Sequence, residues 1–257
     1  MLELLHLKKV YNPGTVREIC LFEDFSLEVP KGQFVSIVGS NGSGKTSLLN
    51  LLCGSITPDK GTILMDGQDI TRMPEHRRLK RIGRIHQNPS MGTCAGMTIL
   101  ENLSLADNKQ KRMNLRPGTD RKQTERYKSL LSPLGLGLEN MLTARAGNLS
   151  GGQRQALAMV MSVMTPIDFL ILDEHTAALD PKTSDIIMEL TGRVIRESKL
   201  TALMVTHNLR HAIEFGDRLM MMHQGVIVMD KQGGEKAATR LEDVLSVFTE
   251  ISIELGN

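Results

Sequence analysis

Short apolar runs alternate along the chain with segments of helical periodicity. Residues 33–39 (QFVSIVG) are typical of a buried strand, and KTSLLNLLCG directly after them predicts a helix that ends at Gly54. A short strand is predicted at GTILMDG, between glycine turns. Further along, FLILDE, LTALMVTH, RLMMMH and GVIVMD read as strands, with a helix after Asp180–Pro181. Strands that alternate with helices in this way predict an α/β fold built on a largely parallel, doubly wound sheet.

The middle of the chain has a different character. From Leu105 to Lys128 the sequence is polar, basic and poor in β-branched residues. This composition indicates a solvated loop that leads into a helix beginning near Thr119 or Asp120. We therefore expect a helical subdomain that is inserted into the α/β core.

The pattern predicts one domain followed by a terminal helix. Its expected limits are residues 1–240 for the domain, with a core at 1–88 and 165–230 and the helical subdomain at about 89–164. The tail, residues 241–257, has apolar residues at helical spacing, namely Leu241, Val244, Leu245, Phe248 and Ile251. A helix docked on the core explains this spacing better than a device for binding a partner.

Composition excludes several classes of protein. The chain has 257 residues, enough for a full core, and its 31 Lys and Arg against 29 Asp and Glu leave a formal net charge of +2. So small an excess argues against a protein that mainly coats nucleic acid, and we expect no nucleic-acid partner. Cys20, Cys53 and Cys94 are scattered without CxxC spacing. We therefore expect neither a disulfide framework nor a zinc site, and this cysteine usage fits a protein of the reducing cytosol.

Hydrophobicity gives no sign of a membrane span or a leader. The longest nearly apolar passage, residues 156–172, contains Pro166 and Asp168, which favours a buried helix, a turn and a buried strand. The first residues, MLELLHLKKV, carry Glu3 and lack a long apolar core, so we do not expect a secretory signal there.

A phosphate-binding loop is predicted at GSNGSGKTS, residues 39–47. The stretch matches G-x-x-x-x-G-K-[ST] and lies between a strand and a helix, as that motif requires. Glycines let backbone N–H groups close around phosphate oxygens, and the helix start adds its own unpaired donors. Lys45 can then neutralise the β and γ phosphates, and the Thr46 hydroxyl can ligate Mg²⁺. The alternative, a chance glycine-rich turn, is disfavoured by the flanking strand and helix.

Two acids follow a buried strand at FLILDE. Asp173 and Glu174 fall at the carboxyl end of that strand, where α/β proteins place their ligands. Asp173 suits a Mg²⁺ site, directly or through another ligand, and Glu174 can orient or deprotonate an attacking water. Solvated acids at a strand end would look the same, so the interpretation depends on the phosphate loop.

A second helix start, NLSGGQRQALAMV, also resembles an anion site. Ser150 and Gln153 have the spacing of a capping box, which by itself would explain them. Gly151 and Gly152 are harder to explain, because glycine in a helix costs roughly 1 kcal/mol relative to alanine. We therefore expect some contact that needs a bare backbone at this point.

Together, NLSGGQ, GSNGSGKTS and FLILDE resemble the ATP-binding cassette (ABC) ATPases, over nearly the whole chain and in the family's order. The resemblance implies a P-loop NTPase (RecA-like) core with a mostly parallel sheet, an antiparallel β subdomain and an inserted helical subdomain. It implies that Tyr11 stacks on adenine, that Gln87 in IHQNP is the Q-loop glutamine and that Asp180 in AALDP is the D-loop aspartate. It also implies that His207 in VTHN is the switch histidine, which contacts the γ-phosphate.

The expected cofactors are ATP and Mg²⁺. Catalysis is assigned to Glu174, His207 and Gln87, and Mg²⁺ binding to Thr46, Gln87 and Asp173. Nucleotide binding is assigned to Tyr11, Gly39, Ser40, Asn41, Gly42, Ser43, Gly44, Lys45, Thr46, Ser47, Ser150, Gly151, Gly152, Gln153 and Asp180.

The resemblance also implies partners. In this family two cassettes dimerise head to tail, and the signature helix of one, here Leu149–Gln153, covers the nucleotide held by the other. We expect a second copy of the chain, transmembrane permease subunits and an extracytoplasmic substrate-binding protein. The expected location is cytoplasmic, peripheral on the inner face of the cell membrane.

One departure from the usual family sequence suggests which class of solute is transported. His175 stands where proline is common, within DEHTAALDPKT, a run that resembles a subgroup of importers associated with amino acids such as tryptophan. We expect His175 to be a subgroup feature rather than a catalytic residue. The favoured function is an ATPase subunit that powers import of a small solute, with an aromatic amino acid first. The alternative is a single-cassette ATPase that drives a non-transport membrane regulator, and the neighbouring genes would discriminate between the two.

Overall fold

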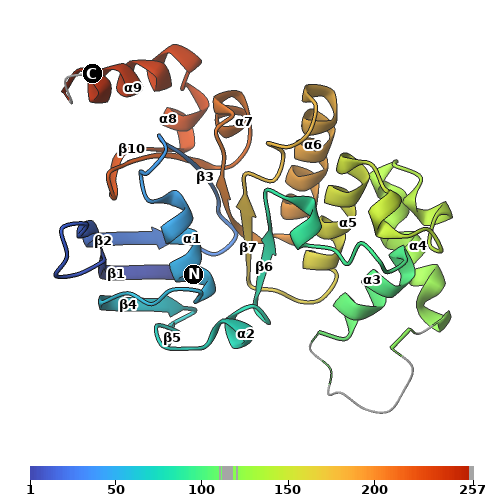
Figure 1. Ribbon diagram of the computed structural model, residues 1–257. Helices are drawn as coiled ribbons and strands as arrows, with labels where there is room; N and C mark the ends of the chain where they lie inside the picture. Colours follow the sequence, from blue (N-terminus) through green and yellow to red (C-terminus); the bar gives the residue numbers. More distant parts are fainter. Residues whose placement is uncertain (110, 112–117, 120, 255–257) are drawn as a thin grey trace. The chain divides into compact units, whose positions relative to one another are not determined.

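The computed structural model describes residues 1–109, 111, 118–119 and 121–254 (Figure 1). Contacts within the chain define two compact units, one of Met1–Leu79 with Ser198–Asn257 and one of Lys80–Glu197. The first unit therefore joins the two ends of the chain, and the second is one continuous segment.

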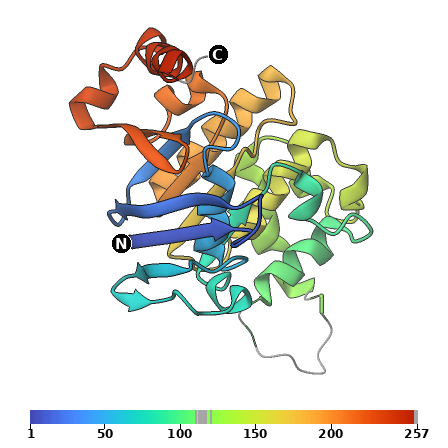
Figure 2. The ribbon, with the colours of Figure 1, turned by 60° about the vertical axis from the view of Figure 1, so that its left-hand side comes forward.

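An antiparallel sheet opens the first unit. β1 (Leu2–Tyr11) lies between β2 (Ile19–Val29) and β4 (Lys60–Met65), and the short β5 (Gln68–Asp69) pairs with β4. β1 and β2 run side by side from the N-terminus in Figure 2. The apolar alternation of β1 shifts by one residue between Leu4 and Leu7, where the register slips at a bulge. Both leucines therefore stay buried.

The second sheet region of this unit surrounds β3 (Phe34–Val38), which is parallel to β8 (Thr201–Val205) and β9 (Arg218–His223). β10 (Val226–Gln232) is antiparallel to β9. β3 and β8 are buried at every position, as expected for parallel strands covered on both faces. The helices of this unit are α1 (Lys45–Cys53), α2 (Glu75–Arg78), α7 (Leu209–Glu214), α8 (Gly233–Ala237) and α9 (Leu241–Glu254).

The predicted C-terminal helix is present and packs on this sheet region. α9 contacts α7, and its Val244 is completely buried in a cluster that includes Val38, the last residue of β3. Val247, Phe248 and Ile251 pack against the same cluster. The apolar spacing of residues 241–251 therefore marks a helix docked on the core of the first unit, although Leu241 and Leu245 face solvent at 44% and 45% exposure.

The second unit combines parallel strands with α-helices (Figure 1). The strands are β6 (Ile82–Ile85) and β7 (Phe169–Asp173), and the helices are α3 (Ile99–Asp107), α4 (Thr124–Leu131), α5 (Gly151–Val163) and α6 (Pro181–Ser198). The short 3₁₀ helices lie at Pro89–Met91, Arg121–Gln123, Ser132–Leu134, Leu138–Asn140 and Ala146–Asn148.

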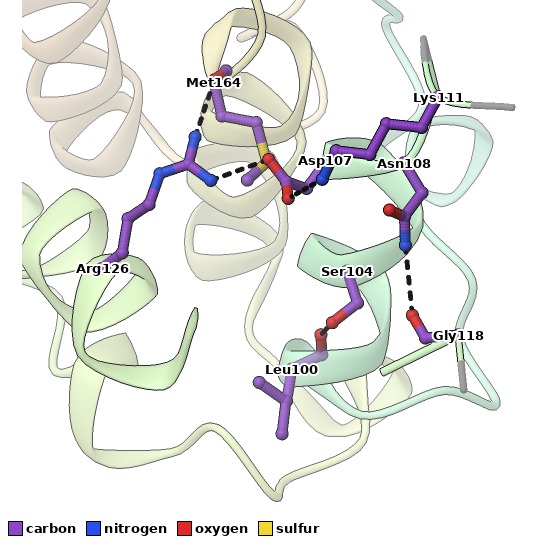
Figure 3. Close-up of polar contacts among 8 residues, drawn as sticks. All are labelled: Leu100, Ser104, Asp107, Asn108, Lys111, Gly118, Arg126 and Met164. Carbon is purple, nitrogen blue, oxygen red and sulfur yellow. Dashed lines mark hydrogen bonds and ion pairs between the residues drawn. The ribbon is translucent and has the colours of Figure 1, made fainter. Parts of the chain in front are cut away.

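A buried carboxylate connects α3 to α4 in this unit (Figure 3). Asp107, the last residue of α3, is 7% exposed and accepts hydrogen bonds from Lys111 Nζ at 2.7 Å and from Arg126 Nη1 at 2.8 Å. Arg126 belongs to α4, and its Nη2 also reaches the carbonyl of Met164, the C-cap of α5. One arginine therefore links α3, α4 and the end of α5.

The helix expected to begin near Thr119 or Asp120 begins later. Asp120 lies outside the described residues, Thr119 is not helical, and α4 starts at Thr124 after the 3₁₀ turn Arg121–Gln123. Such a turn often forms the first part of a helix, because it tightens the backbone before α-type hydrogen bonds can start.

The expected fold class is confirmed, since parallel strands flanked by helices occur with a separate antiparallel sheet. Among the residues that the model describes, no helix is long and apolar enough to cross a membrane. The apolar passage from Ala156 divides into the end of α5, a turn and β7, as the sequence predicts.

Candidate functional site

The predicted phosphate loop joins β3 to α1 in the first unit. Gly39, Gly42 and Gly44 have φ angles of 153°, 78° and 105°, which side chains rarely adopt. A Cβ at Gly39 would come within 2.2 Å of the Met222 carbonyl oxygen, whereas one at Gly42 would meet nothing within 4 Å. The backbone is therefore tightly held at its start and open at its centre.

Lys45 lies folded into this loop. Its side chain is buried, and its ammonium group donates to the carbonyls of Gly39 and Ser40 at 2.8 and 2.9 Å and to Ser43 Oγ at 3.3 Å. No side chain caps the first turn of α1, because the N-cap is Gly44. The start of α1 and the Lys45 cation therefore belong to the same loop, and this arrangement fits a phosphate group.

The β9–β10 turn supports the loop from behind. Gly225 N donates to the Ser43 carbonyl at 3.0 Å, and Met222 is the residue against which Gly39 packs. A cavity of about 320 Å³ lies beside this contact, lined by Ser40, Asn41, Gly42, Ser43, Met221, Met222, His223, Gln224, Phe248 and Ile251. The loop is therefore braced by the hairpin, and α9 forms part of the same surroundings.

Tyr11 and His207 both lie in the first unit with the loop. The Tyr11 hydroxyl donates to Ser47 Oγ of α1 at 3.0 Å, and the Lys9 ammonium sits 5.6 Å from the ring centroid. His207 follows β8, whose end is fixed beside β3 because Thr206 N donates to the Ile37 carbonyl at 3.1 Å. The next residue, Asn208, caps α7, and the His207 side chain is exposed.

The second unit brings Gln87, Asp173 and Glu174 to one sheet edge. β6 and β7 are parallel, with Ile85 opposite Leu172, so the residues that follow both strands emerge together. Gln87 is exposed, whereas Asp173 and Glu174 are partly buried. Glu174 has a φ angle of 46°, an uncommon conformation that often marks a functional position.

Asp173 is held by a neighbour that sequence reasoning missed. Arg84 Nη2 of β6 donates to Asp173 Oδ2 at 2.7 Å, and the two side chains are only 13% and 16% exposed. No group of three or more His, Cys, Asp or Glu side chains suited to a metal exists within the described part of the chain. The donor set still fits Mg²⁺, which proteins usually bind through one or two carboxylates together with substrate phosphates.

His175 points away from this edge. Its side chain is 2% exposed and its Nε2 lies 3.3 Å from Thr191 Oγ1 of α6. Thr191 in turn donates to the Ile187 carbonyl within the same helix. His175 therefore contacts the interior of the second unit, and its expected status as a subgroup feature stays a prediction.

The second predicted anion site starts α5. Ser150 and Gln153 form the capping box in both directions, with Gln153 N donating to Ser150 Oγ and Ser150 N donating to Gln153 Oε1. Gly152 is required by packing within the chain, because a Cβ there would come 2.3 Å from Thr183 Cγ2. Gly151 is exposed, and a Cβ there would meet only the end of Leu179 at 3.1 Å.

Asp180 connects this helix start to α6. Its carboxylate accepts hydrogen bonds from Thr183, and those from the Thr183 hydroxyl and backbone N–H lower the pKa of Asp180. The same Thr183 packs on Gly152, so one residue of α6 contacts both Asp180 and the start of α5. Both Ser150 and Asp180 remain exposed.

Gln155 is another residue that sequence reasoning missed. It is fully buried in α5, and its Nε2 donates to the carbonyl of His86, the residue before Gln87. The sequence signal for it is slight, because Gln155 is a polar residue directly before the apolar run ALAMV. Through Gln155, α5 holds the backbone directly before Gln87.

The family model described as ABC transporter matches residues 22–177, more than half of the chain. This chain belongs to the ABC transporter family. As a member of that family it is an ATPase. Its predicted phosphate loop lies in the first unit, and the helix start predicted to be its signature motif lies in the second.

Relatives of this ABC transporter ATPase cover almost its whole length. It is 44% identical over 248 residues to a tyrosine transport ATP-binding protein of Clostridioides difficile, covering 96% of this chain and 98% of that one. It is 31% identical over 227 residues to a thiamine import ATP-binding protein of Salmonella choleraesuis, covering 88% of both. A dimeric cassette bound to ADP and phosphate in a post-hydrolysis state has a TM-score of 0.76 at 26% identity, with coverage of 90% and 98%.

Proposed function

We propose that the chain is the ATP-hydrolysing subunit that powers import of an amino acid through a separate permease. An aromatic amino acid is the first candidate for the solute. The observation that carries this proposal is the 44% identity to a tyrosine transport ATP-binding protein, spread over 96% of the chain. Likeness over so much of the length supports a shared partner arrangement as well as a shared nucleotide site. The run DEHTAALDPKT had suggested the same class of solute.

We assign a role to each predicted site residue, one unit at a time. In the first unit Lys45 neutralises phosphate charge, Thr46 contributes a hydroxyl ligand, Tyr11 stacks on the base and His207 contacts the γ-phosphate. In the second unit Asp173 serves the metal and Glu174 orients or deprotonates the attacking water. Gln87 joins the metal ligands and senses the state of the site. When bound, Mg²⁺ would neutralise phosphate charge and orient the phosphates for attack.

The proposed assembly contains two copies of the chain, head to tail, with permease subunits and an extracytoplasmic substrate-binding protein. Exposed Ser150 and Asp180 would then face the nucleotide of the second copy. The chain would lie on the cytoplasmic side, peripheral on the inner face of the cell membrane. The two relatives described above are both transport proteins, and neither supports the alternative of a non-transport regulator.

Uptake in cells tests the proposal. In the source organism, deletion of the gene should abolish high-affinity uptake of one labelled aromatic amino acid and leave thiamine uptake unchanged. Complementation with the intact gene should restore uptake, whereas a Lys45→Ala copy, expressed at the same level, should not. Unchanged uptake of every amino acid in the deletion strain, at concentrations below saturation, would refute the proposed solute class.

A further inference from the structure

The ion pair between Arg84 and Asp173 has no part in the roles proposed so far. It is produced by the register of the two strands, because Arg84 of β6 is opposite Ile171 and Asp173 lies two residues further along β7. Residues two apart share a face of a strand, so the guanidinium and the carboxylate meet diagonally. Their 2.7 Å contact is mostly shielded from solvent, with side chains 13% and 16% exposed.

We propose that Arg84 is a counter-ion that competes with Mg²⁺ for the carboxylate of Asp173 and so sets the metal affinity of the site. The inference rests on the proposed function, in which Asp173 serves the metal. A partly desolvated carboxylate needs a cation, and here a guanidinium meets that need before any metal arrives. A metal that uses the same carboxylate must bind next to a positive charge or displace it.

The competition has a definite sign. The guanidinium and the metal carry charge of the same sign, so at contact distance in a partly shielded site they repel each other. Removal of the guanidinium should therefore tighten Mg²⁺ binding, by roughly tenfold for a contact that stays partly open to solvent. ATP without metal does not use Asp173 in this scheme, and its affinity should stay the same.

The same two strands carry a matched control. Arg81, just before β6, pairs through Nε with Asp168, just before β7, and Asp168 N also donates to the Arg81 carbonyl at 2.8 Å. These side chains are more exposed, at 30% and 43%, and they lie at the amino ends of the strands, away from Asp173. If the Arg84–Asp173 pair only holds the two strands together, loss of Arg84 should affect Mg²⁺ binding no more than loss of Arg81.

The test measures equilibrium binding of a non-hydrolysable ATP analogue to the full-length protein by calorimetry, as Mg²⁺ is titrated and again in EDTA. Arg84→Met, which keeps length and removes charge, should lower the Mg²⁺ midpoint roughly tenfold. Arg81→Met should match the wild type, and both should keep the wild-type affinity in EDTA. In an Asp173→Asn background, Arg84→Met should have no effect.

Two results would overturn the inference and can be told apart. An Arg84→Met midpoint equal to or higher than that of Arg81→Met, while Asp173→Asn loses the Mg²⁺ response, removes the counter-ion role and leaves the proposed site standing. A wild-type midpoint in Asp173→Asn removes the role of Asp173 and the inference with it. If Arg84→Met does not fold, Arg84→Gln, neutral but able to hydrogen-bond, gives the same readout.

Discussion

Glu174 is the residue whose backbone conformation most directly matches its proposed role. A φ of 46° at a non-glycine residue costs of order 1 kcal/mol or more. Glu174 adopts this strained conformation directly after Asp173, the last residue of β7. The turn redirects the chain so that Glu174 leaves the strand while His175 enters the interior beside Thr191.

Replacement of Glu174 by Gln should separate binding from turnover. The amide keeps the shape of the side chain and loses its basicity, so nucleotide affinity should be retained while steady-state phosphate release falls roughly 10²–10⁴-fold. Release at the wild-type rate would assign the base to another residue, with His207 the first to test. An Arg81→Met preparation controls for loss of folded protein, because Arg81 is outside the site.

At the scale of single residues, the sequence predicts local features better than packing between distant parts of the chain. Lys45 in the loop and the capping box of Ser150 and Gln153 are as predicted. Some contact that needs a bare backbone is expected at Gly151 and Gly152, and at Gly152 the partner inside the chain is Thr183 of α6, which the sequence did not indicate. Packing partners so far apart in the chain leave no local pattern, and for the same reason Arg84 went unnoticed beside Asp173.

Among the elements, the ends of α3, α4 and α5 depend on one carboxylate. Burial alone would raise the pKa of Asp107, but hydrogen bonds from Lys111 and Arg126 outweigh it and the pKa is lowered. A carboxyl whose pKa is lower in the folded state stabilises the fold above its unfolded value of 3.8, and this stabilisation is lost as pH falls through the folded value.

Asp107→Asn should therefore destabilise the protein in a pH-dependent way. At pH 7 the free energy of unfolding should fall by about 2 kcal/mol, the usual range for hydrogen bonds to a charged group. Below about pH 4 the difference from the wild type should shrink. Urea unfolding at several pH values measures it, and a difference that stays constant down to pH 3 would contradict the assignment.

α9 offers a test of whether the C-terminal helix supports the phosphate loop. Phe248 packs on the cluster that contains Val38 and lines the cavity beside Ser40–Ser43, whereas Leu245 is 45% exposed. Phe248→Ala should lower stability by about 1–2 kcal/mol, less than for a fully buried phenylalanine, and weaken ATP binding. Leu245→Ala should change neither, and equal effects of both variants would rule out a specific contact.

The existence of the elements was easier to predict than their limits. Continuous apolar runs gave β3, β7 and β8 because parallel strands buried on both faces need them. The bulge in β1 and the late start of α4 depend on pairing and on a 3₁₀ turn, neither of which has a distinctive composition. The fold class could be predicted from the order of strands and helices, because that order does not depend on the residues at which each element begins and ends.

For the molecule as a whole, the predicted site residues divide between the two units. The phosphate loop, Tyr11 and His207 belong to the first, and Gln87, Glu174 and the signature helix belong to the second. A head-to-tail pair of chains would combine the loop of one copy with Ser150 of the other. Mixing two inactive variants tests this pairing.

Lys45→Ala and Ser150→Ala homodimers should each carry two damaged sites. In a mixed heterodimer one site has both defects and the other has neither, so ATP-dependent dimers should reappear on size exclusion with some ATPase activity. If Ser150 only caps α5, its loss should cost about 1 kcal/mol of local stability. The Ser150 variant would then hydrolyse ATP alone, and mixing would add nothing.

The placement of the tyrosines has a spectroscopic consequence. The chain has two tyrosines and no tryptophan. Tyr11 stands beside the phosphate loop of the first unit, and Tyr127, 1% exposed, lies inside the second. Ultraviolet emission of the unmodified protein therefore has one source in each unit. With Tyr11→Phe the remaining signal reports the second unit alone, and with Tyr127→Phe it reports the surroundings of Tyr11 in the first.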